Sequence, residues 1–196
     1  MNRWQLRQFA KDLTPQAVKY KDEPFRLRGG DYSHWYVDHR HGLCSGPMIK
    51  RAARLIIAKA KDKNIPYDRV AGAGIAGIGL AIDVVIVEAL KNPNKDLEWV
   101  IANLDKNDTD PENGYGLYGG DVEGRQVLLV DDIGSTGGSL LELGGLVRDK
   151  GGKVDHAINV SDRSDGRTAA ALARVGIDYH YMLDFNESLG VLQPAV

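Results

Sequence analysis

The sequence predicts one α/β domain, in which a mostly parallel, twisted sheet is covered by helices on both faces. From residue 69 onward, apolar segments of strand length alternate with helical patterns, an order typical of a buried parallel sheet. Glycines cluster after two of these segments, at 72–79 and 134–138, where the turns that bind ligands lie in such sheets. The 196 residues, 43% of them hydrophobic, suffice for one substantial core.

The first quarter of the chain predicts a small α+β segment ahead of this sheet. Apolar residues recur at helical spacing over residues 2–12. Residues 25–38 are typical of two short strands around a turn at Gly29-Gly30. A helix is expected to begin at Gly46-Pro47 and to run to about residue 61, because proline suits the first turn of a helix.

The rest of the chain supplies the strands and helices of the sheet. We expect strands at residues 69–74, 98–104, 126–132, 153–161 and 178–183, and helices at residues 77–91, 137–149 and 166–175. The loops at the carboxyl ends of the strands should carry the ligand site, and three are conspicuous: residues 71–77, 104–121 and 131–139.

The composition of the chain limits the classes of partner that it is expected to bind. Twenty-seven acidic residues against 25 Lys and Arg give a formal charge of -2, which favours neither nucleic acid nor an anionic membrane as a partner. The one apolar run of membrane length, Val70–Leu90, is interrupted by Asp83 and Glu88. The single cysteine, Cys44, allows no disulfide within the chain, and the charged N-terminus has no apolar signal region. A cytoplasmic location is therefore expected.

The segment Val127–Leu140, "VLLVDDIGSTGGSL", carries the strongest chemical signal. An apolar strand delivers Asp131 and Asp132 at its carboxyl end, and small or hydroxyl residues then lead into a helix. Backbone N–H groups, hydroxyls and a helix N-terminus form a phosphate cradle, whereas paired carboxylates accept hydrogen bonds from a sugar diol. No Gly-Lys-Ser/Thr follows, so the segment is not a P-loop. It predicts a phosphate bound beside a ribose.

This segment resembles the phosphoribosyl pyrophosphate (PRPP) motif of type I phosphoribosyltransferases. The resemblance implies the type I phosphoribosyltransferase fold, with Asp131 and Asp132 on the ribose hydroxyls. It also implies that the 5-phosphate is bound by a loop that we call the phosphate cradle: Ser135, Thr136, Gly137, Gly138 and Ser139.

The glycines Gly72-x-Gly74-x-x-Gly77 allow two interpretations. Their spacing is that of a dinucleotide-binding fingerprint, which would make the protein a flavin or nicotinamide oxidoreductase. The fingerprint needs an acid about 20 residues further on, and the nearest at a strand end, Asp105, comes later. In the phosphoribosyltransferase family, the loop at this position contacts the pyrophosphate of PRPP. The resemblance therefore assigns the pyrophosphate to Gly74, Ile75, Ala76 and Gly77.

Two further segments resemble orotate phosphoribosyltransferases. Residues 25–40, "FRLRGGDYSHWYVDHR", are similar to a motif near the N-terminus of that family, and "VSDRSDGRTAAALARVGI" (160–177) is similar to its DR-x-x-G element and the following helix. The resemblance extends from about Phe25 to Gly190. It implies an orotate site, and arginines suit a planar carboxylate. The orotate-binding residues implied are Arg28, Tyr36, Ser135 and Arg163.

Residues 104–121, which we call the lid, match the family less well. The family's mobile catalytic loop has four basic positions, of which only Lys106 remains, and the segment is instead rich in acids: Asp105, Asp108, Asp110 and Glu112. A length of about 17 residues without regular structure indicates a functional loop. The resemblance makes Lys106, Asp131 and Asp132 the catalytic residues.

The reaction implied is the transfer of phosphoribose from PRPP to orotate, giving orotidine 5′-monophosphate and pyrophosphate. The resemblance also implies Mg²⁺, held through PRPP with no direct protein ligand assigned, and a homodimer. The chain is expected to form a hood over residues 1–45 and a core over residues 46–196. Because the lid departs from the family, two alternatives stay open: a phosphoribosyltransferase for another nucleobase, and a PRPP-binding regulator without catalysis.

Overall fold

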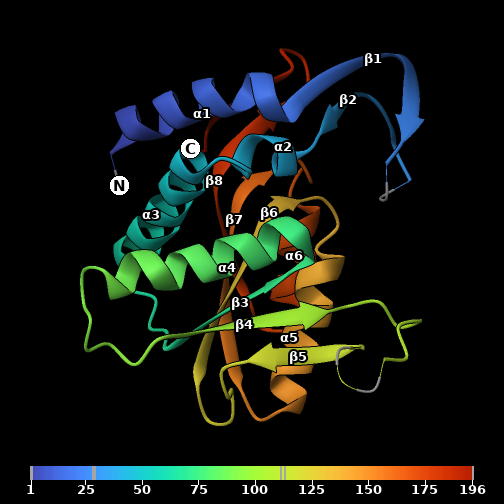
Figure 1. Ribbon diagram of the computed structural model, residues 1–196. Helices are drawn as coiled ribbons and strands as arrows, with labels where there is room; N and C mark the ends of the chain where they lie inside the picture. Colours follow the sequence, from blue (N-terminus) through green and yellow to red (C-terminus); the bar gives the residue numbers. More distant parts are fainter. Residues whose placement is uncertain (1, 28–29, 111, 113, 196) are drawn as a thin grey trace.

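The computed structural model describes residues 2–27, 30–110, 112 and 114–195. Its centre is a seven-stranded sheet in the order β5-β4-β3-β6-β7-β8-β9 (Figure 1). The five inner strands are parallel, whereas β5 and β9 run antiparallel at the two edges. This confirms the predicted mostly parallel sheet. The strands are β3 Arg69–Ala73, β4 Glu98–Asn103, β5 Gly116–Gly119, β6 Gln126–Gly134, β7 Lys153–Asp162, β8 Asp178–Asn186 and β9 Val191–Pro194.

Helices cover both faces of the sheet, as predicted. Two helices, α3 (Gly46–Asp62) and α4 (Gly74–Ala89), pack on one face and bury side chains such as Ile56 and Leu80. On the other face, α5 (Gly138–Asp149) and α6 (Arg167–Ala173) enclose a second apolar cluster that includes Leu143 and Leu172 (Figure 1). The parallel strands are therefore buried from both sides.

Both edge strands differ from the sequence prediction. β9 is absent from it, and β5 lies within the lid, which was expected to have no regular structure. Each is only four residues long and gains its regular structure by pairing with a neighbour: β5 with β4, and β9 with β8. Short edge strands of this kind carry too little periodicity to be recognised locally.

The hood consists of α1 (Arg3–Ala17), the antiparallel pair β1 (Val18–Arg26) and β2 (Tyr32–Val37), and the short α2 (His39–Leu43). The helix α1 is longer than the predicted 2–12 and contains Pro15. One side of it is buried, including Phe9 and Leu13, and Thr14 Oγ1 accepts a hydrogen bond from Leu192 N of β9 at 3.1 Å. The hairpin of β1 and β2 extends beside the carboxyl ends of the inner strands (Figure 1).

No helix in the described part of the chain is both long enough and apolar enough to span a membrane. The apolar run Val70–Leu90 is divided between buried β3 and α4.

Candidate active site

A cavity of about 530 Å³ opens where the hood meets the carboxyl ends of β3 and β6. It is lined by hood residues such as Tyr36 and by core residues that include both aspartates of β6. A second cavity, of about 390 Å³, shares Asp131, Ser135 and Ser139 with it and is lined by the phosphate cradle. The two cavities therefore form one site at the end of the sheet where the sequence predicted it.

The phosphate cradle connects β6 to α5. Gly137, the residue before α5, has φ +79°, a left-handed conformation that favours glycine. Thr136 Oγ1 accepts from Gly138 N at 3.4 Å, and all five cradle residues line the smaller cavity. The exposed N–H groups of a helix N-terminus are a general anion site, so this geometry suits a phosphate.

The end of β6 packs very closely against the next two strands. A Cβ atom at Gly134 would collide with Tyr179 Oη and Asp162 Oδ2. Asp162 accepts hydrogen bonds from Ser164 N at 2.8 Å and from Tyr179 Oη at 2.9 Å. Burial and the neighbouring Asp162 raise the pKa of Tyr179, which keeps it a hydrogen-bond donor. These contacts hold the turn after β7 against the cradle.

The two aspartates lie at the mouth of the site, and both line the larger cavity. Asp131 Oδ1 accepts from Asp132 N at 2.9 Å. Gly77 of α4 approaches so closely that a Cβ there would lie 3.1 Å from Asp131 Oδ1. Two adjacent carboxylates that line an open cavity can accept hydrogen bonds from the hydroxyls of a sugar.

Behind the aspartates lies a buried histidine that the sequence did not single out. His39 is fully buried in α2, and its Nε2 lies 3.1 Å from Ser161 Oγ of β7. Burial lowers the pKa of His39, although Asp132 and Asp38 oppose the shift. His39 is therefore a neutral ring at pH 7.

Residues 74–77 form the first turn of α4 and not the predicted loop, because α4 begins at Gly74. Gly74 has φ +66°, and Gly72 lies so close to α4 that an added Cβ would collide with the Gly77 carbonyl. The glycines thus allow the helix to begin directly at the sheet. Gly74, Ile75 and Ala76 line the larger cavity, and Ile75 is exposed there. An anion at this position would meet a second helix N-terminus.

The hood forms one side of the larger cavity. The residues predicted to bind the nucleobase that accepts phosphoribose lie here, and we call it the acceptor side. Tyr36 lines it and packs edge-to-face against Phe25, with ring centroids 5.6 Å apart. Ser135 also lines this cavity, as expected. Arg28, which was predicted to bind orotate, lies outside the described residues.

Arg163 lines the same cavity, but hood and core groups hold most of its guanidinium. Its side chain is 7% exposed and donates to Trp35 O at 3.1 Å, to Ser33 Oγ at 3.3 Å and to Glu187 Oε2 at 3.4 Å. Burial lowers the pKa of Arg163, and Glu187 opposes the shift. Among the described residues, its buried Nε has no hydrogen-bond partner. That donor is costly to leave unpaired, by about 1–3 kcal/mol.

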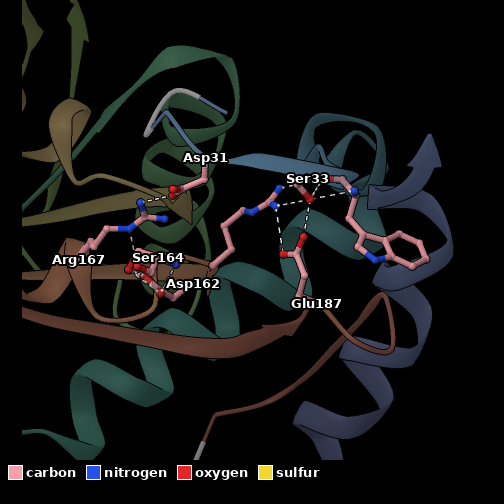
Figure 2. Close-up of polar contacts among 8 residues, drawn as sticks. Asp31, Ser33, Asp162, Ser164, Arg167 and Glu187 are labelled. Atoms are coloured by element: carbon pink, nitrogen blue, oxygen red, sulfur yellow. Dashed lines mark hydrogen bonds and ion pairs between the residues drawn. The ribbon is translucent and has the colours of Figure 1, made fainter. Parts of the chain in front are cut away.

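A second arginine joins the hood to the core. Arg167 lines the cavity, donates from Nε to Ser164 O at 2.9 Å and forms an ion pair with Asp31 just before β2 (Figure 2). Sequence reasoning missed Arg167, Ser33 and Glu187 as site residues. Ser33 and Arg167 each lay within a matched segment, whereas no local pattern marked Glu187.

Lys106 does not line either part of the site. Its Nζ lies 2.9 Å from Glu142 Oε1 on α5 and above the ring of Tyr115, whose hydroxyl donates to the same carboxylate oxygen at 3.1 Å. Glu142 raises the pKa of Lys106, and Lys106 in turn lowers that of Glu142. Glu142, which the sequence did not indicate, lines the cavity of the phosphate cradle. The one basic lid residue that matches the family is thus held at the rim of that cavity.

Acidic side chains of the lid accept hydrogen bonds from its own backbone and stabilise its turns. Asp105 Oδ1 accepts from Asn107 N at 2.9 Å, and Asp110 Oδ1 accepts from Glu112 N at 2.8 Å. Aspartate side chains commonly cap the backbone two residues further on in this way. Within the described residues, no group of three or more His, Cys, Asp or Glu side chains could by itself hold a metal ion.

No protein-family model matches the chain. An orotate phosphoribosyltransferase of Methanopyrus kandleri is 33% identical over 175 residues, which cover 89% of this chain and 85% of that protein. The orotate phosphoribosyltransferase of Methanospirillum hungatei is 29% identical over 157 residues, covering 79% and 80%.

Solved structures agree on the fold. The orotate phosphoribosyltransferase of Mycobacterium tuberculosis in complex with PRPP superposes with a TM-score of 0.71 at 22% identity, covering 94% of this chain and 91% of that one. This likeness supports the architecture independently of the sequence matches.

Proposed function

The chain belongs to the orotate phosphoribosyltransferase family, and we propose that it transfers phosphoribose from PRPP to orotate with release of pyrophosphate. The enzyme class is therefore that of the pentosyltransferases. The observation that carries the proposal is the continuous site formed by the two cavities, with a phosphate cradle, a pair of carboxylates and an arginine-lined acceptor side. Membership of this family replaces the dinucleotide interpretation of the glycines, and Gly72 and Gly77 have packing roles.

Each half of the site has a distinct role in the proposed reaction. The phosphate cradle anchors the 5-phosphate, and Asp131 and Asp132 fix the ribose and favour positive charge as it develops on the sugar. The α4 N-terminus faces the pyrophosphate, which leaves with its negative charge. Catalysis of this kind rests on positioning and on charge stabilisation, without a covalent intermediate on the protein.

The acceptor is held between the hood and the core. Tyr36 offers an aromatic ring, Ser135 a hydroxyl and Arg163 the positive charge of its guanidinium to a planar, anionic pyrimidine. Arginine donors suit a carboxylate better than a neutral base edge, because hydrogen bonds between charged groups are the stronger ones. This favours orotate over nucleobases that lack a carboxylate.

Magnesium fits the donors present, although no residue set encloses it. Mg²⁺ is usually bound through one or two carboxylates together with substrate phosphates, and Asp131 and Asp132 supply that number of carboxylates beside the cavity. The ion would neutralise charge on the pyrophosphate. We further propose a homodimer and a cytoplasmic location, the latter supported by the free, exposed thiol of Cys44.

The direct test is turnover by the purified protein. With PRPP, orotate and Mg²⁺, we expect orotate to be consumed and orotidine 5′-monophosphate to form, and chelation of Mg²⁺ to stop the reaction. PRPP bound in calorimetry with no product from any nucleobase would refute the proposal. That outcome would favour a PRPP-binding regulator, which the acidic lid and the position of Lys106 beside Glu142 also support.

A further inference from the structure

The turn between β8 and β9 carries a carboxylate that reaches the hood. Glu187 Oε1 accepts from Ser33 Oγ of β2 at 2.5 Å, and Oε2 accepts from Arg163 at 3.4 Å (Figure 2). Ser33 and Arg163 lie far from Glu187 in the chain, and both line or adjoin the acceptor side. We call Ser33, Arg163 and Glu187 the hood clamp.

The two partners of Glu187 are buried, which makes their contacts specific. Ser33 is 4% exposed, and Arg163 keeps only 7% of its side chain accessible. A serine hydroxyl carries a single proton, and Ser33 Oγ lies closer to Glu187 Oε1 than to its other acceptor, Trp35 O at 3.2 Å, which assigns the proton to Glu187. The lone pairs of Ser33 Oγ then accept from Arg163 at 3.3 Å and from Trp35 N at 2.9 Å. Glu187 thus fixes the direction of the hydroxyl.

The same contacts hold the guanidinium of Arg163 in place. One terminal nitrogen donates to Trp35 O, and the other donates to Ser33 and Glu187. Among the described residues, the buried Nε lacks a partner, and Nη1 has a second N–H besides the one that it donates to Trp35 O. Glu187 does not itself line the cavity, whereas Arg163 and Tyr36 do. Any effect of Glu187 on a ligand must therefore pass through the clamp.

We propose that Glu187 is a positioning residue for the acceptor: it holds Arg163 and Ser33 so that β2, with Tyr36, closes the acceptor side of the cavity. The proposal rests on the proposed function, because the acceptor is the orotate of that reaction. Among the described residues, the hydrogen bonds and the ion pair of the Glu187 side chain join it to Ser33 and Arg163 rather than to the phosphate cradle or the aspartates. The clamp meets the cradle segment through the backbone of Arg163, whose N donates to Gly134 O at 2.9 Å. Because that bond does not involve the Glu187 side chain, we expect removal of that side chain to spare the site for PRPP.

Removal of Glu187 should therefore separate the two substrates. In Glu187→Ala the guanidinium loses its counter-charge and the Ser33 hydroxyl can rotate. A hydrogen bond to a charged group is strong enough that we expect the KM for orotate to rise about 10-fold. The KM for PRPP should stay within about twofold. Ser33→Ala should act in the same direction, and the double variant should fall short of the product of the two because they share Arg163.

Two further variants make the result decisive. Asp12→Asn is the matched control: it breaks another ion pair between hood and core, Asp12 with Arg51 at 2.7 Å, at side chains that line neither cavity of the site. It should leave both KM values unchanged. Glu187→Gln retains an acceptor for Ser33 without the charge and should give an intermediate KM for orotate. If circular dichroism shows that Glu187→Ala does not fold, the KM values of Glu187→Gln and Ser33→Ala test the proposal instead.

The outcomes distinguish the two proposals. If the wild type turns over orotate but the variants leave its KM unchanged, the positioning role of Glu187 is overturned while the proposed function stands. The same conclusion follows if the KM rises equally for both substrates. A wild type that turns over no orotate would refute the proposed function, and the clamp with it.

Discussion

The phosphate cradle and the acceptor side of the same site are built in opposite ways. The cradle comes from one continuous segment, in which β6, the aspartates, the cradle and α5 follow one another along the chain. The acceptor side combines Tyr36 and Ser33 of the hood with Arg163 after β7 and Glu187 after β8. In the proposed reaction, local sequence therefore positions the phosphoribose, whereas long-range packing selects the base.

This difference predicts that a change in the first region affects every substrate alike. Asp131→Asn and Asp132→Asn each remove a charge that faces the developing cation, so we expect kcat/KM to fall by roughly 10²–10³-fold. The loss should be the same for any accepted nucleobase, measured by steady-state kinetics. A loss that depended on the base would place the aspartates on the acceptor side.

The lid should have an effect of intermediate size. Lys106→Ala removes the basic group that remains in the lid at a family position, and we expect kcat to fall roughly 10²-fold because charge on the departing pyrophosphate is then less neutralised. Glu142→Gln is the counterpart, since it releases Lys106 from its ion pair. It should leave kcat unchanged or higher. Equal loss in both variants would show that the contact itself is what the enzyme needs.

The stability of the fold should be sensitive to a single methyl group where β3 packs against the first turn of α4. Gly72→Ala places a Cβ against the Gly77 carbonyl, which is backbone and cannot move aside, so we expect about 1–3 kcal/mol lower free energy of unfolding. Gly145→Ala, within α5 and facing open space, should instead stabilise by about 0.5–1 kcal/mol. Denaturant titration of both variants measures this. Equal stabilities would contradict the close approach of β3 and α4.

The smallest effect concerns pH. The pKa of His39 in the folded protein lies below its ordinary value, so the unfolded chain binds more protons below about pH 6.5. Stability should therefore fall as pH drops through 6.5, with a slope of up to about 1.4 kcal/mol per pH unit. His39→Gln should reduce this slope, although His180, whose pKa is also lowered by burial, retains part of it. An unchanged slope would mean that folding does not lower the pKa of His39.

The same contrast explains what could be predicted from the sequence. The parallel sheet, the start of α3 at Gly46 and the cradle were all marked by local patterns, and the structure places them as expected. The roles of the site residues stay predictions, since geometry alone does not test them. The structure does bring Tyr36, Ser135 and Arg163 to one cavity.

What could not be predicted depends on partners distant in sequence. β9 forms because β8 and α1 lie beside it, and Glu187 gains a role only because the hood folds over it. Residues 74–77 looked like a loop because glycines disfavour helices locally. Packing of α4 directly against β3 overrides that preference.

The most direct test of the account is acceptor preference. With saturating PRPP and Mg²⁺, kcat/KM is measured for orotate and for uracil, which differs by lacking the carboxylate. The account predicts a preference for orotate of about 100-fold or more, because charged hydrogen bonds to the acceptor are then lost. Equal use of uracil, or faster use of a purine, would contradict an acceptor side built for a carboxylated pyrimidine.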